Sequence, residues 1–585
     1  MTLKDIDLAK LTITQGIKAT GAVSMDHSGW SVSGAGNING DNCSDFIIGA
    51  YTVSPLGRKN AGETYLIFGK SSGLIDIDLK NLTITQGIKI LGANQNDNSG
   101  SSVSGAGDVN GDGYNDLIIA ATKKSYLIFG KNTSFTNIDL GTLTLSQGIT
   151  MVGSNIKNNT GWAVSNAGDV NNDGYDDFII GSHHENPLGR IAAGETYLIF
   201  GKKTLTNIDL VTLSLPQGIK IMGANINDNS GWSVSSAGDV NNDGYDDIII
   251  SARYATPLGR TNAGETYLIF GKRNGFADID LKTLTPPQGI KILGADLNDN
   301  SGWAVSNAGD VNSDGYDDII IGARYANPLG LTNAGETYLI FGKSNDFVDI
   351  DLKNLTLTQG IKISGADLND NSGSSVSNAG DVNNDGYDDM IIGAPSAPKG
   401  TFRGETYILF GENSTSFSNI DLGNFTTSQG IKIKGAATND YTGSSVSSVG
   451  DVNNDGYDDV IIGATDATSL ERYEAGESYL IFGDENNSPP TPPTPIPTPT
   501  PNTSNLGEYF AIGTSIFSTL TLGALIFYGY RNIKRNQYDY LPSNSNINSK
   551  KSCCGMMDKM TTTAPPPQDI LIRLSLNHDD MVYLE

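Results

Sequence analysis

The chain alternates short apolar runs with Gly, Asn, Asp and Pro, in a pattern that recurs seven times before residue 485. Each unit contains four such runs, close to SVSxAG, IIIGA, ETYLIFG and GIKIxG, and turn-forming residues separate them. IIIGA and YLIFG are continuous apolar runs, typical of strands that are covered on both faces. No run has a helical period, so we predict four short strands in each unit.

The motifs YLIFG and QGIK, together with one polar loop, mark the repeat. The loop begins at Asn37, Asp108, Asp169, Asp239, Asp310, Asp381 and Asp451, at intervals of 71, 61, 70, 71, 71 and 70 residues. The second unit is short because only AATKKS separates its two apolar strands. Radial packing of four-stranded sheets would cover both faces of each strand. We therefore predict an all-β fold, a seven-bladed β-propeller over residues 1–485; a β-solenoid or a string of small domains is the alternative.

The chain ends of this region predict how the ring closes. The region begins with the GIK strand at residues 16–18 and ends with the YLIFG strand at Gly483, so the last unit lacks its fourth strand. Pairing the two would remove both sheet edges. We expect the first strand to complete the blade made by residues 443–483.

The polar loop, DVNNDGYDD in its commonest form, predicts a calcium site. Side-chain oxygens at positions 1, 3, 5 and 9, a glycine at 6 and the carbonyl of residue 7 are what Ca²⁺ requires, since it takes six to eight oxygen ligands. The candidate ligands in six copies are Asp108, Asn110, Asp112, Tyr114 and Asp116; Asp169, Asn171, Asp173, Tyr175 and Asp177; Asp239, Asn241, Asp243, Tyr245 and Asp247; Asp310, Asn312, Asp314, Tyr316 and Asp318; Asp381, Asn383, Asp385, Tyr387 and Asp389; Asp451, Asn453, Asp455, Tyr457 and Asp459.

The loop is not an EF-hand, because position 12 is apolar, as at Ile180, and strands flank it. An Asx-rich turn without metal is the alternative, although clustered carboxylates repel one another unless a cation lies among them. The first copy has Asn42 in place of the glycine and only two charged candidates, Asp41 and Asp45.

Three further segments follow the repeats. Residues 486–508 form a Pro/Thr-rich stalk, and PPTPPTPIPTPTP within it favours extended polyproline II. Residues 509–530 are an uncharged stretch of 22, which predicts a single transmembrane helix. Residues 531–585 begin with three basic residues near the helix and are expected to be a short, disordered cytoplasmic tail, leaving the propeller outside the cell membrane.

The start of the chain does not agree with export. MTLKDIDLAKLTITQG has no basic start followed by an apolar run, so it does not read as a signal peptide. We expect a leader to be missing from this sequence, or export by another route; a tail-anchored cytoplasmic protein is the less favoured alternative.

Composition excludes several classes. The net charge of −27 argues against a nucleic-acid partner. Three cysteines in 585 residues cannot build a disulfide framework. Nucleophile motifs, a P-loop and HExxH are all missing, so we do not expect an enzyme. Asn-x-Ser/Thr sequons, such as those at Asn81 and Asn354, would make the protein a glycoprotein in a eukaryotic secretory route.

Seven units with a calcium-type loop followed by IIIGA and a second Gly-ended strand resemble the FG-GAP repeats of the integrin α-subunit propeller. The resemblance covers residues 1–485 and implies calcium as the cofactor and an adhesion-like role. The tail lacks the integrin GFFKR motif and no sequence remains for leg domains, so pairing with an integrin β-like subunit is doubtful.

Meander topology places the calcium loops at one end of the ring and the loops between strands 2 and 3 and between strands 4 and 1 at the other. We predict that a ligand binds at that other end, through Trp162, Arg190, Trp232, Arg253, Tyr254, Arg260, Trp303, Arg324 and Tyr325. Packing of the Trp rings between blades, with solvated arginines, is the alternative.

The function that we expect is a calcium-stabilised, single-pass adhesion or receptor protein for an extracellular protein or acidic glycan; a membrane-anchored lectin is the alternative.

Overall fold

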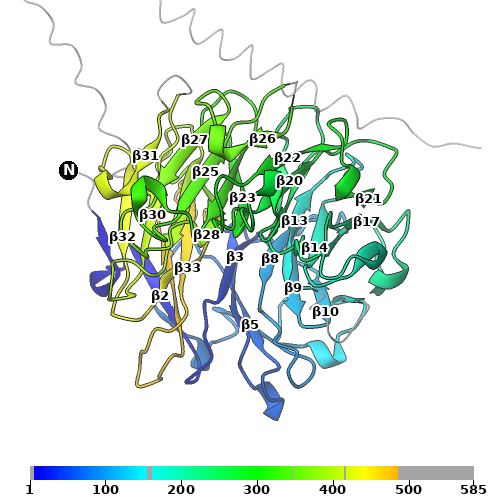
Figure 1. Ribbon diagram of the computed structural model, residues 1–585. Helices are drawn as coiled ribbons and strands as arrows, with labels where there is room; N and C mark the ends of the chain where they lie inside the picture. The colour runs from blue at the N-terminus through cyan, green and yellow to red at the C-terminus, as the bar shows by residue number, and fades with distance from the viewer. Residues whose placement is uncertain (1–4, 154–160, 345–346, 414–416, 485–585) are drawn as a thin grey trace, which may run out of the picture. The chain divides into compact units, whose positions relative to one another are not determined.

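The computed structural model describes residues 5–153, 161–344, 347–413 and 417–484. The chain divides into two units, Met1–Thr494 and Pro495–Glu585, and every described residue lies in the first. These residues form seven five-stranded β-sheets around a common centre (Figure 1). The predicted all-β, seven-bladed propeller is confirmed.

The predicted stalk (486–508), transmembrane helix (509–530) and tail (531–585) lie outside the described residues. Within the part that the structure describes, no helix is long and apolar enough to cross a membrane.

Four strands of each blade form an antiparallel meander, and we number the blades 1 to 7 by their first strands. The first strands are β3 (Ser31–Gly36), β8 (Val103–Gly107), β13 (Ala163–Gly168), β18 (Val234–Gly238), β23 (Ala304–Gly309), β28 (Ser375–Gly380) and β33 (Thr442–Gly450). The second strands are β4 (Asp45–Ala50), β9 (Asp116–Ala121), β14 (Asp177–Ser182), β19 (Asp247–Ala252), β24 (Asp318–Ala323), β29 (Asp389–Ala394) and β34 (Asp459–Ala464). The third strands are β5 (Glu63–Ile67), β10 (Lys124–Ile128), β15 (Glu195–Ile199), β20 (Glu265–Ile269), β25 (Glu336–Ile340), β30 (Glu405–Leu409) and β35 (Glu477–Ile481). The fourth strands are β7 (Gly87–Leu91), β12 (Gly148–Val152), β17 (Gly218–Met222), β22 (Gly289–Leu293), β27 (Gly360–Ser364), β32 (Gly430–Lys434) and, for blade 7, β2 (Gly16–Thr20).

A fifth, two-residue strand with the sequence Ile-Asp lies at the outer edge of each blade and was not predicted. In blade order these strands are β11 (Ile138–Asp139), β16 (Ile208–Asp209), β21 (Ile279–Asp280), β26 (Ile350–Asp351), β31 (Ile420–Asp421), β1 (Ile6–Asp7) and β6 (Ile77–Asp78). All except β1, which precedes β2 near the start of the chain, belong to the connection between strands 3 and 4 of the following blade. Each pairs in parallel with the fourth strand of its own blade, as β11 does with β7. The 3 to 4 connection therefore runs along the edge of the preceding blade and does not stay at one end of the ring.

Short 3₁₀ helices complete the connections. Those after the fifth strands are η1 (Leu8–Lys10), η3 (Leu79–Asn81), η4 (Leu140–Thr142), η6 (Leu210–Thr212), η8 (Leu281–Thr283), η10 (Leu352–Asn354) and η11 (Leu422–Asn424). Four Pro-Leu-Gly turns in the 2 to 3 loops are η2 (Pro55–Gly57), η5 (Pro187–Gly189), η7 (Pro257–Gly259) and η9 (Pro328–Gly330).

The core lies between blades. All six residues of the second strands are buried, as in β4 and β9, because neighbouring blades cover both sheet faces. Seven hydrophobic clusters each combine residues of two adjacent blades. The continuous apolar runs of the sequence are thus explained by packing against two neighbours.

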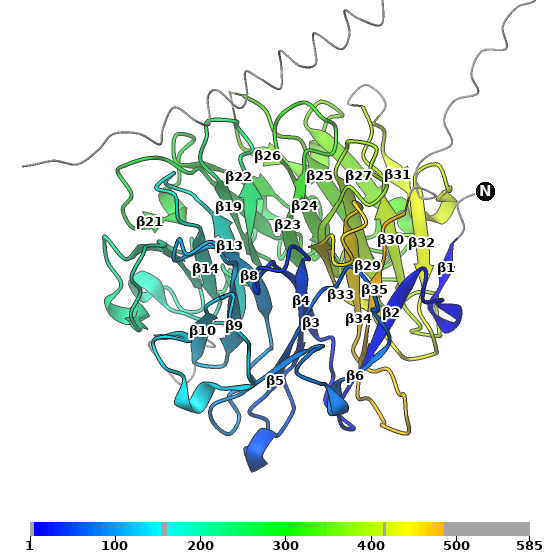
Figure 2. The same ribbon diagram turned by 180° about the vertical axis from the view of Figure 1, so that it is seen from behind.

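The ring closes as predicted. Strand β2 pairs antiparallel with β35, from Gly16 opposite Ile481 to Thr20 opposite Glu477. Figure 2 shows β2, from the start of the chain, beside β35 and β34 from the end of the repeats. Because the first and last strands share one sheet, opening the ring would break hydrogen bonds as well as apolar contacts.

Candidate functional site

The nine-residue polar loops join strands 1 and 2 of every blade and define what we call the loop end. The loop of blade 2 illustrates the geometry. Asp108, at position 1, accepts hydrogen bonds from the backbone N–H groups of Asp112 and Gly113, at 3.0 and 2.8 Å. Gly113, at position 6, has a φ of +90°, a conformation that glycine adopts without strain. The side chain at position 1 and the glycine at position 6 therefore take part in forming the turn itself.

The carboxylate at position 9 joins the loop to the third strand. Asp116 is fully buried and accepts hydrogen bonds from Gly130 N–H at 2.9 Å and Val109 N–H at 3.2 Å. A Cβ on Gly130 would lie 2.2 Å from the Asn115 carbonyl oxygen, which explains the glycine that ends each YLIFG run. The same two bonds occur at Asp45, Asp177, Asp247, Asp318, Asp389 and Asp459.

These loops suit a hard cation in their electrostatics and donor type. Burial, together with the charges of Asp112 and Asp108, raises the pKa of Asp116 to about 8. At position 3, the Oδ1 atoms of Asn312 and Asn453 are buried without a hydrogen-bond partner. A buried carboxylate repelled by its neighbours and an unpartnered amide oxygen are both favourable to a bound cation.

The carboxylate groups of a loop do not converge on one point in this structure. Among the described residues, no three His, Cys, Asp or Glu side chains are grouped closely enough to hold a metal ion. The side chains at positions 1, 5 and 9 accept backbone N–H groups instead, as Asp173 does from Tyr175 N–H at 3.2 Å. The prediction that these residues bind calcium therefore stays a prediction.

The residue at position 8 has a role that sequence reasoning missed. Asp176 of blade 3 accepts a hydrogen bond from Asp108 N–H of blade 2 at 2.7 Å, and Asp246 accepts from Asp169 N–H at 2.8 Å. Equivalent bonds join the loops of blades 4 to 7 in pairs. The first carboxylate of the Asp-Asp pair thus links the loop of each blade from 3 to 7 to the loop of the preceding blade. Its recurrence beside position 9 was the available signal.

At the opposite end of the blades, aromatic and basic side chains interleave around the innermost strands. We call this the tryptophan end. Trp162, Trp232 and Trp303 directly precede the first-strand core residues of blades 3, 4 and 5, and their rings follow one another with centroids 5.1 and 5.7 Å apart. The predicted placement opposite the polar loops is confirmed, since pairs such as Ala163 with Gly181 and Gly168 with Asp177 separate the two ends.

The residue after the second strand of blades 3 and 4 inserts between two of these rings. His183 lies 5.0 Å from the Trp162 ring and 4.9 Å from the Trp232 ring. The Arg253 guanidinium lies 3.2 Å from the Trp232 ring centroid and 4.4 Å from that of Trp303. Stacking between blades, the alternative left open by the sequence, is therefore part of the arrangement.

Arg253 and Arg324 are held by rings and not by acids. Arg253 is 7% exposed and Arg324 is half-buried, with its guanidinium 4.7 Å from the Trp303 centroid. The Nε atoms of both arginines are buried without a hydrogen-bond partner. Burial lowers the pKa of Arg253 to about 10, and no carboxylate is among the groups that offset this effect. Tyr254 and Tyr325 lie beside them.

One cavity opens among the tryptophans. It has a volume of about 270 Å³ and is lined by the four Trp residues, by Ser101, Ser102 and Ser233, and by Ala163, Val164 and Val234. Trp30 of blade 1, which also lines it, is 43% exposed. Ser374 and Ser444 occupy the Trp slot in blades 6 and 7, so the aromatic lining is confined to one side.

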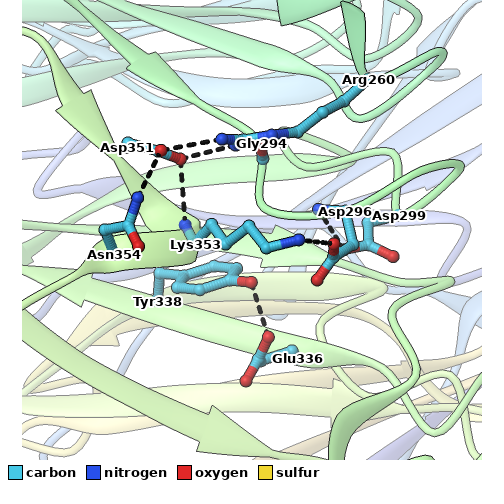
Figure 3. Close-up of polar contacts among 9 residues, drawn as sticks. All are labelled: Arg260, Gly294, Asp296, Asp299, Glu336, Tyr338, Asp351, Lys353 and Asn354. Carbon is cyan, nitrogen blue, oxygen red and sulfur yellow. Dashed lines mark hydrogen bonds and ion pairs between the residues drawn. The ribbon is translucent and has the colours of Figure 1, made fainter. Parts of the chain in front are cut away.

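Arg190 and Arg260 have a different environment from the one predicted. Arg260 donates to Asp351 Oδ1 at 2.6 Å and Oδ2 at 2.8 Å and to the Gly294 carbonyl at 2.8 Å (Figure 3). Arg190 pairs with Asp280 at 2.8 Å. Arg58, Arg403 and Arg472 bind the Asp of a fifth strand in the same way. These arginines clamp the fifth strand to its blade, which separates them from Arg253 and Arg324.

The repeats of this chain are similar to those of known proteins. The FG-GAP repeat model matches residues 230–269, 301–340, 372–409 and 442–481, and an FG-GAP-like repeat model matches residues 108–180. A phosphatidylinositol-glycan-specific phospholipase D of Bos taurus is 35% identical over 29% of this chain and 19% of its own length.

Two integrin α chains are also similar. Integrin alpha pat-2 of Caenorhabditis elegans is 28% identical over 39% of this chain and 17% of its own length, and integrin alpha-IIb of Mus musculus is 28% identical over 33% and 18%. The chain therefore spans less than a fifth of the length of these curated relatives.

Proposed function

The chain is an integrin-α-like propeller of FG-GAP repeats, and from this premise we propose that it is a cell-surface adhesion or receptor protein that binds its ligand at the tryptophan end. The observation that carries the proposal is the row of rings and guanidinium groups formed by Trp162, Trp232, Arg253, Trp303 and Arg324 beside a cavity. Trp, Tyr and Arg are the residues that most often anchor partners at interfaces.

The two ends of the propeller support this assignment by contrast. At the loop end, each carboxylate is engaged in a backbone hydrogen bond that forms the turn or joins blades. At the tryptophan end, the buried Nε–H groups of Arg253 and Arg324 have no hydrogen-bond partner among the described residues. A cavity opens beside the Trp rings that these arginines contact. Unused donors beside an aromatic opening favour recognition, since unpaired buried polar groups are costly unless a ligand satisfies them.

Calcium is the proposed cofactor. The ligands would be the side-chain oxygens at positions 1, 3, 5 and 9 of the six complete loops and the carbonyl at position 7. Bound calcium would supply positive charge to loops whose buried carboxylates repel one another, and so would stabilise the fold. Millimolar calcium, typical outside cells, would occupy sites of the affinity common in extracellular modules.

Membrane attachment belongs to the same proposal and rests on the sequence of residues 486–585. The uncharged stretch 509–530 would anchor the chain, and the basic residues after it would keep the tail inside the cell. Protease added to intact cells should then release a soluble fragment that contains the propeller. Release of that fragment only after permeabilisation would contradict this orientation.

The proposal includes no catalytic step. The phospholipase D relatives are similar to this chain along 19% of their own length, and the activity in their name is a property of those proteins. An extracellular protein is the proposed ligand. A membrane-anchored lectin is the second candidate, because the four Trp rings that line one cavity would stack on sugar rings.

Binding experiments with the full chain test the function. Purified protein is presented to a cell-surface protein extract and to a glycan array, as wild type and as the double variant Arg253→Thr with Trp303→Ser. These substitutions copy Thr465 of blade 7 and Ser374 of blade 6, so the fold tolerates both residues at these slots. We expect saturable binding of the wild type only. Absence of saturable binding to either source, or equal binding by the variant, would refute the proposed recognition role.

A further inference from the structure

We propose that the tryptophan end binds an acidic sugar ring, a pyranose that carries a carboxylate, in the cavity between the Trp rings of blades 1, 3, 4 and 5. The inference rests on the proposed function and names the ligand class of that site. It follows from which interactions the described side chains already make and which they leave open.

The first step concerns charge. An aromatic cluster of this kind would ordinarily attract a cation to the ring faces. Here the protein provides the cations itself, because Arg253 stacks between Trp232 and Trp303 and Arg324 stacks on Trp303. A second cation would meet two guanidinium groups that no carboxylate neutralises, so the site disfavours basic ligands and favours an anion.

The second step concerns the unpaired donors. Each of the two guanidinium groups has a buried Nε–H without a hydrogen-bond partner, although guanidinium groups pair with planar carboxylates in bidentate fashion. Three other arginines of the 2 to 3 loops show this preference within the same molecule: Arg58, Arg260 and Arg472 bind both oxygens of an Asp. Arg190 also has Nε and Nη2 atoms without a partner, but it already pairs with Asp280. Arg253 and Arg324 pair with no carboxylate among the described residues, and although neither lines the cavity, both contact Trp residues that do.

The third step concerns the body of the ligand. The cavity of about 270 Å³ is lined by tryptophan, serine and small apolar residues, and Trp30 is 43% exposed. A pyranose ring has apolar C–H faces that stack on indole and hydroxyl groups that serine can bind. An acidic peptide side chain would use the arginines but would leave most of the indole surface wet, so the sugar uses both halves of the site.

The probe for the test is a galacturonate tetrasaccharide, and its fully methyl-esterified form is the matched control, because esterification keeps the rings and removes the charge. Binding to the full-length protein in detergent with millimolar calcium is followed by tryptophan fluorescence and calorimetry. We expect saturable binding of the acid form and at least tenfold weaker binding of the ester. Equal binding of the two forms would overturn the proposal.

Variants locate the site. Trp303→Ser and Arg253→Thr should each weaken binding of the acid form by roughly thirtyfold, as loss of an interface anchor commonly does. The matched control Arg58→Leu also removes one positive charge, at a clamp position where blade 5 has Leu331 in nature, and should leave affinity unchanged. Melting curves confirm that each variant is folded. A loss with Arg58→Leu as large as that with Arg253→Thr would show general electrostatic attraction and overturn the site.

A hexaglutamate peptide separates the inference from the proposed function. Binding of hexaglutamate without binding of the galacturonate tetrasaccharide would overturn the acidic-sugar assignment and leave a protein-binding role standing. If the wild type binds a surface extract or a glycan array but no probe competes, the ligand class is wrong and the recognition role remains. If neither source nor probe binds, both fail together.

Discussion

The loop end and the tryptophan end of the same blades differ in how much they vary. At the loop end, the Asp-rich sequence and its hydrogen bonds recur in nearly every blade, including the bonds that link adjacent loops. At the tryptophan end, the slot that holds Trp in four blades holds Ser in three, and the residue after the second strand is Tyr, Thr, His, Arg, Arg, Pro or Thr. Repetition at one end indicates a structural task, and variation at the other indicates recognition of something asymmetric.

Cation removal should give the largest effect and acts on the loop end. If calcium fills the loops, raising its free concentration to ten times Kd adds about 1.4 kcal/mol of stability for each occupied site. We expect the melting temperature to be clearly lower in EGTA than after millimolar calcium is restored. Magnesium should substitute poorly for calcium. An unchanged melting temperature would contradict calcium binding and reduce the loops to metal-free turns.

Substitution of one buried carboxylate should have the next largest effect. Asp318→Ala leaves the N–H groups of Gly342 and Val311 unsatisfied in the core, which costs about 4 kcal/mol of unfolding free energy. Asp318→Asn keeps one of the two acceptor oxygens and turns its NH₂ donor toward the other N–H group, so it should cost about half as much or more. Urea denaturation measures both, and Trp303→Ser is the matched change at the tryptophan end. If Trp303→Ser destabilised the protein as much as Asp318→Ala, the division of tasks between the ends would fail.

A smaller effect concerns the arginine clamps. Blade 5 has Leu331 where blade 4 has Arg260. Its fifth strand nevertheless has Asp421 at the position of Asp351, and this carboxylate already accepts from Gly423 N–H at 2.9 Å. Leu331→Arg should therefore stabilise the protein by about 1 kcal/mol, and Arg260→Leu should destabilise it by about as much. Thermal melts at low and high salt measure both. Stabilisation that persists unchanged in high salt would mean that the new side chain acts by packing and not by pairing.

The smallest effect lies at the junction where the ring closes. His27 Nδ1 lies 3.1 Å from Asp466 Oδ1, and this hydrogen bond raises the pKa of His27. The bond stabilises the folded state fully below the unfolded pKa of about 6.5, and the contribution disappears as pH rises through the folded pKa. Wild-type stability should thus exceed that of His27→Asn by about 0.5 kcal/mol at pH 6 and by less at pH 8. Blades 2, 4, 5 and 6 have Asn at this slot, so the variant keeps the turn. A difference that is the same at both pH values would exclude the ion pair as its source.

The sequence by itself determined the number of blades, their four main strands, the position of the polar loops and the closure of the ring by β2. These features are repeated patterns of apolar and turn-forming residues, and each is read within one unit of the chain. The ends at which the polar loops and the Trp residues lie followed from strand alternation, as the separation of Trp162 from Asp169 by one strand illustrates, whereas the path of the 3 to 4 connection did not.

Only the tertiary structure decided which partners the side chains choose. Arg260 and Arg253 are seven residues apart in one loop, yet Arg260 pairs with Asp351 of a strand delivered by the next blade, and Arg253 stacks between Trp232 and Trp303. The fifth strand was likewise hidden, because two residues are too short to show a periodicity and their partner lies in another blade. These contacts join residues about 20 to 90 positions apart and depend on how blades pack, and no local pattern encodes that choice.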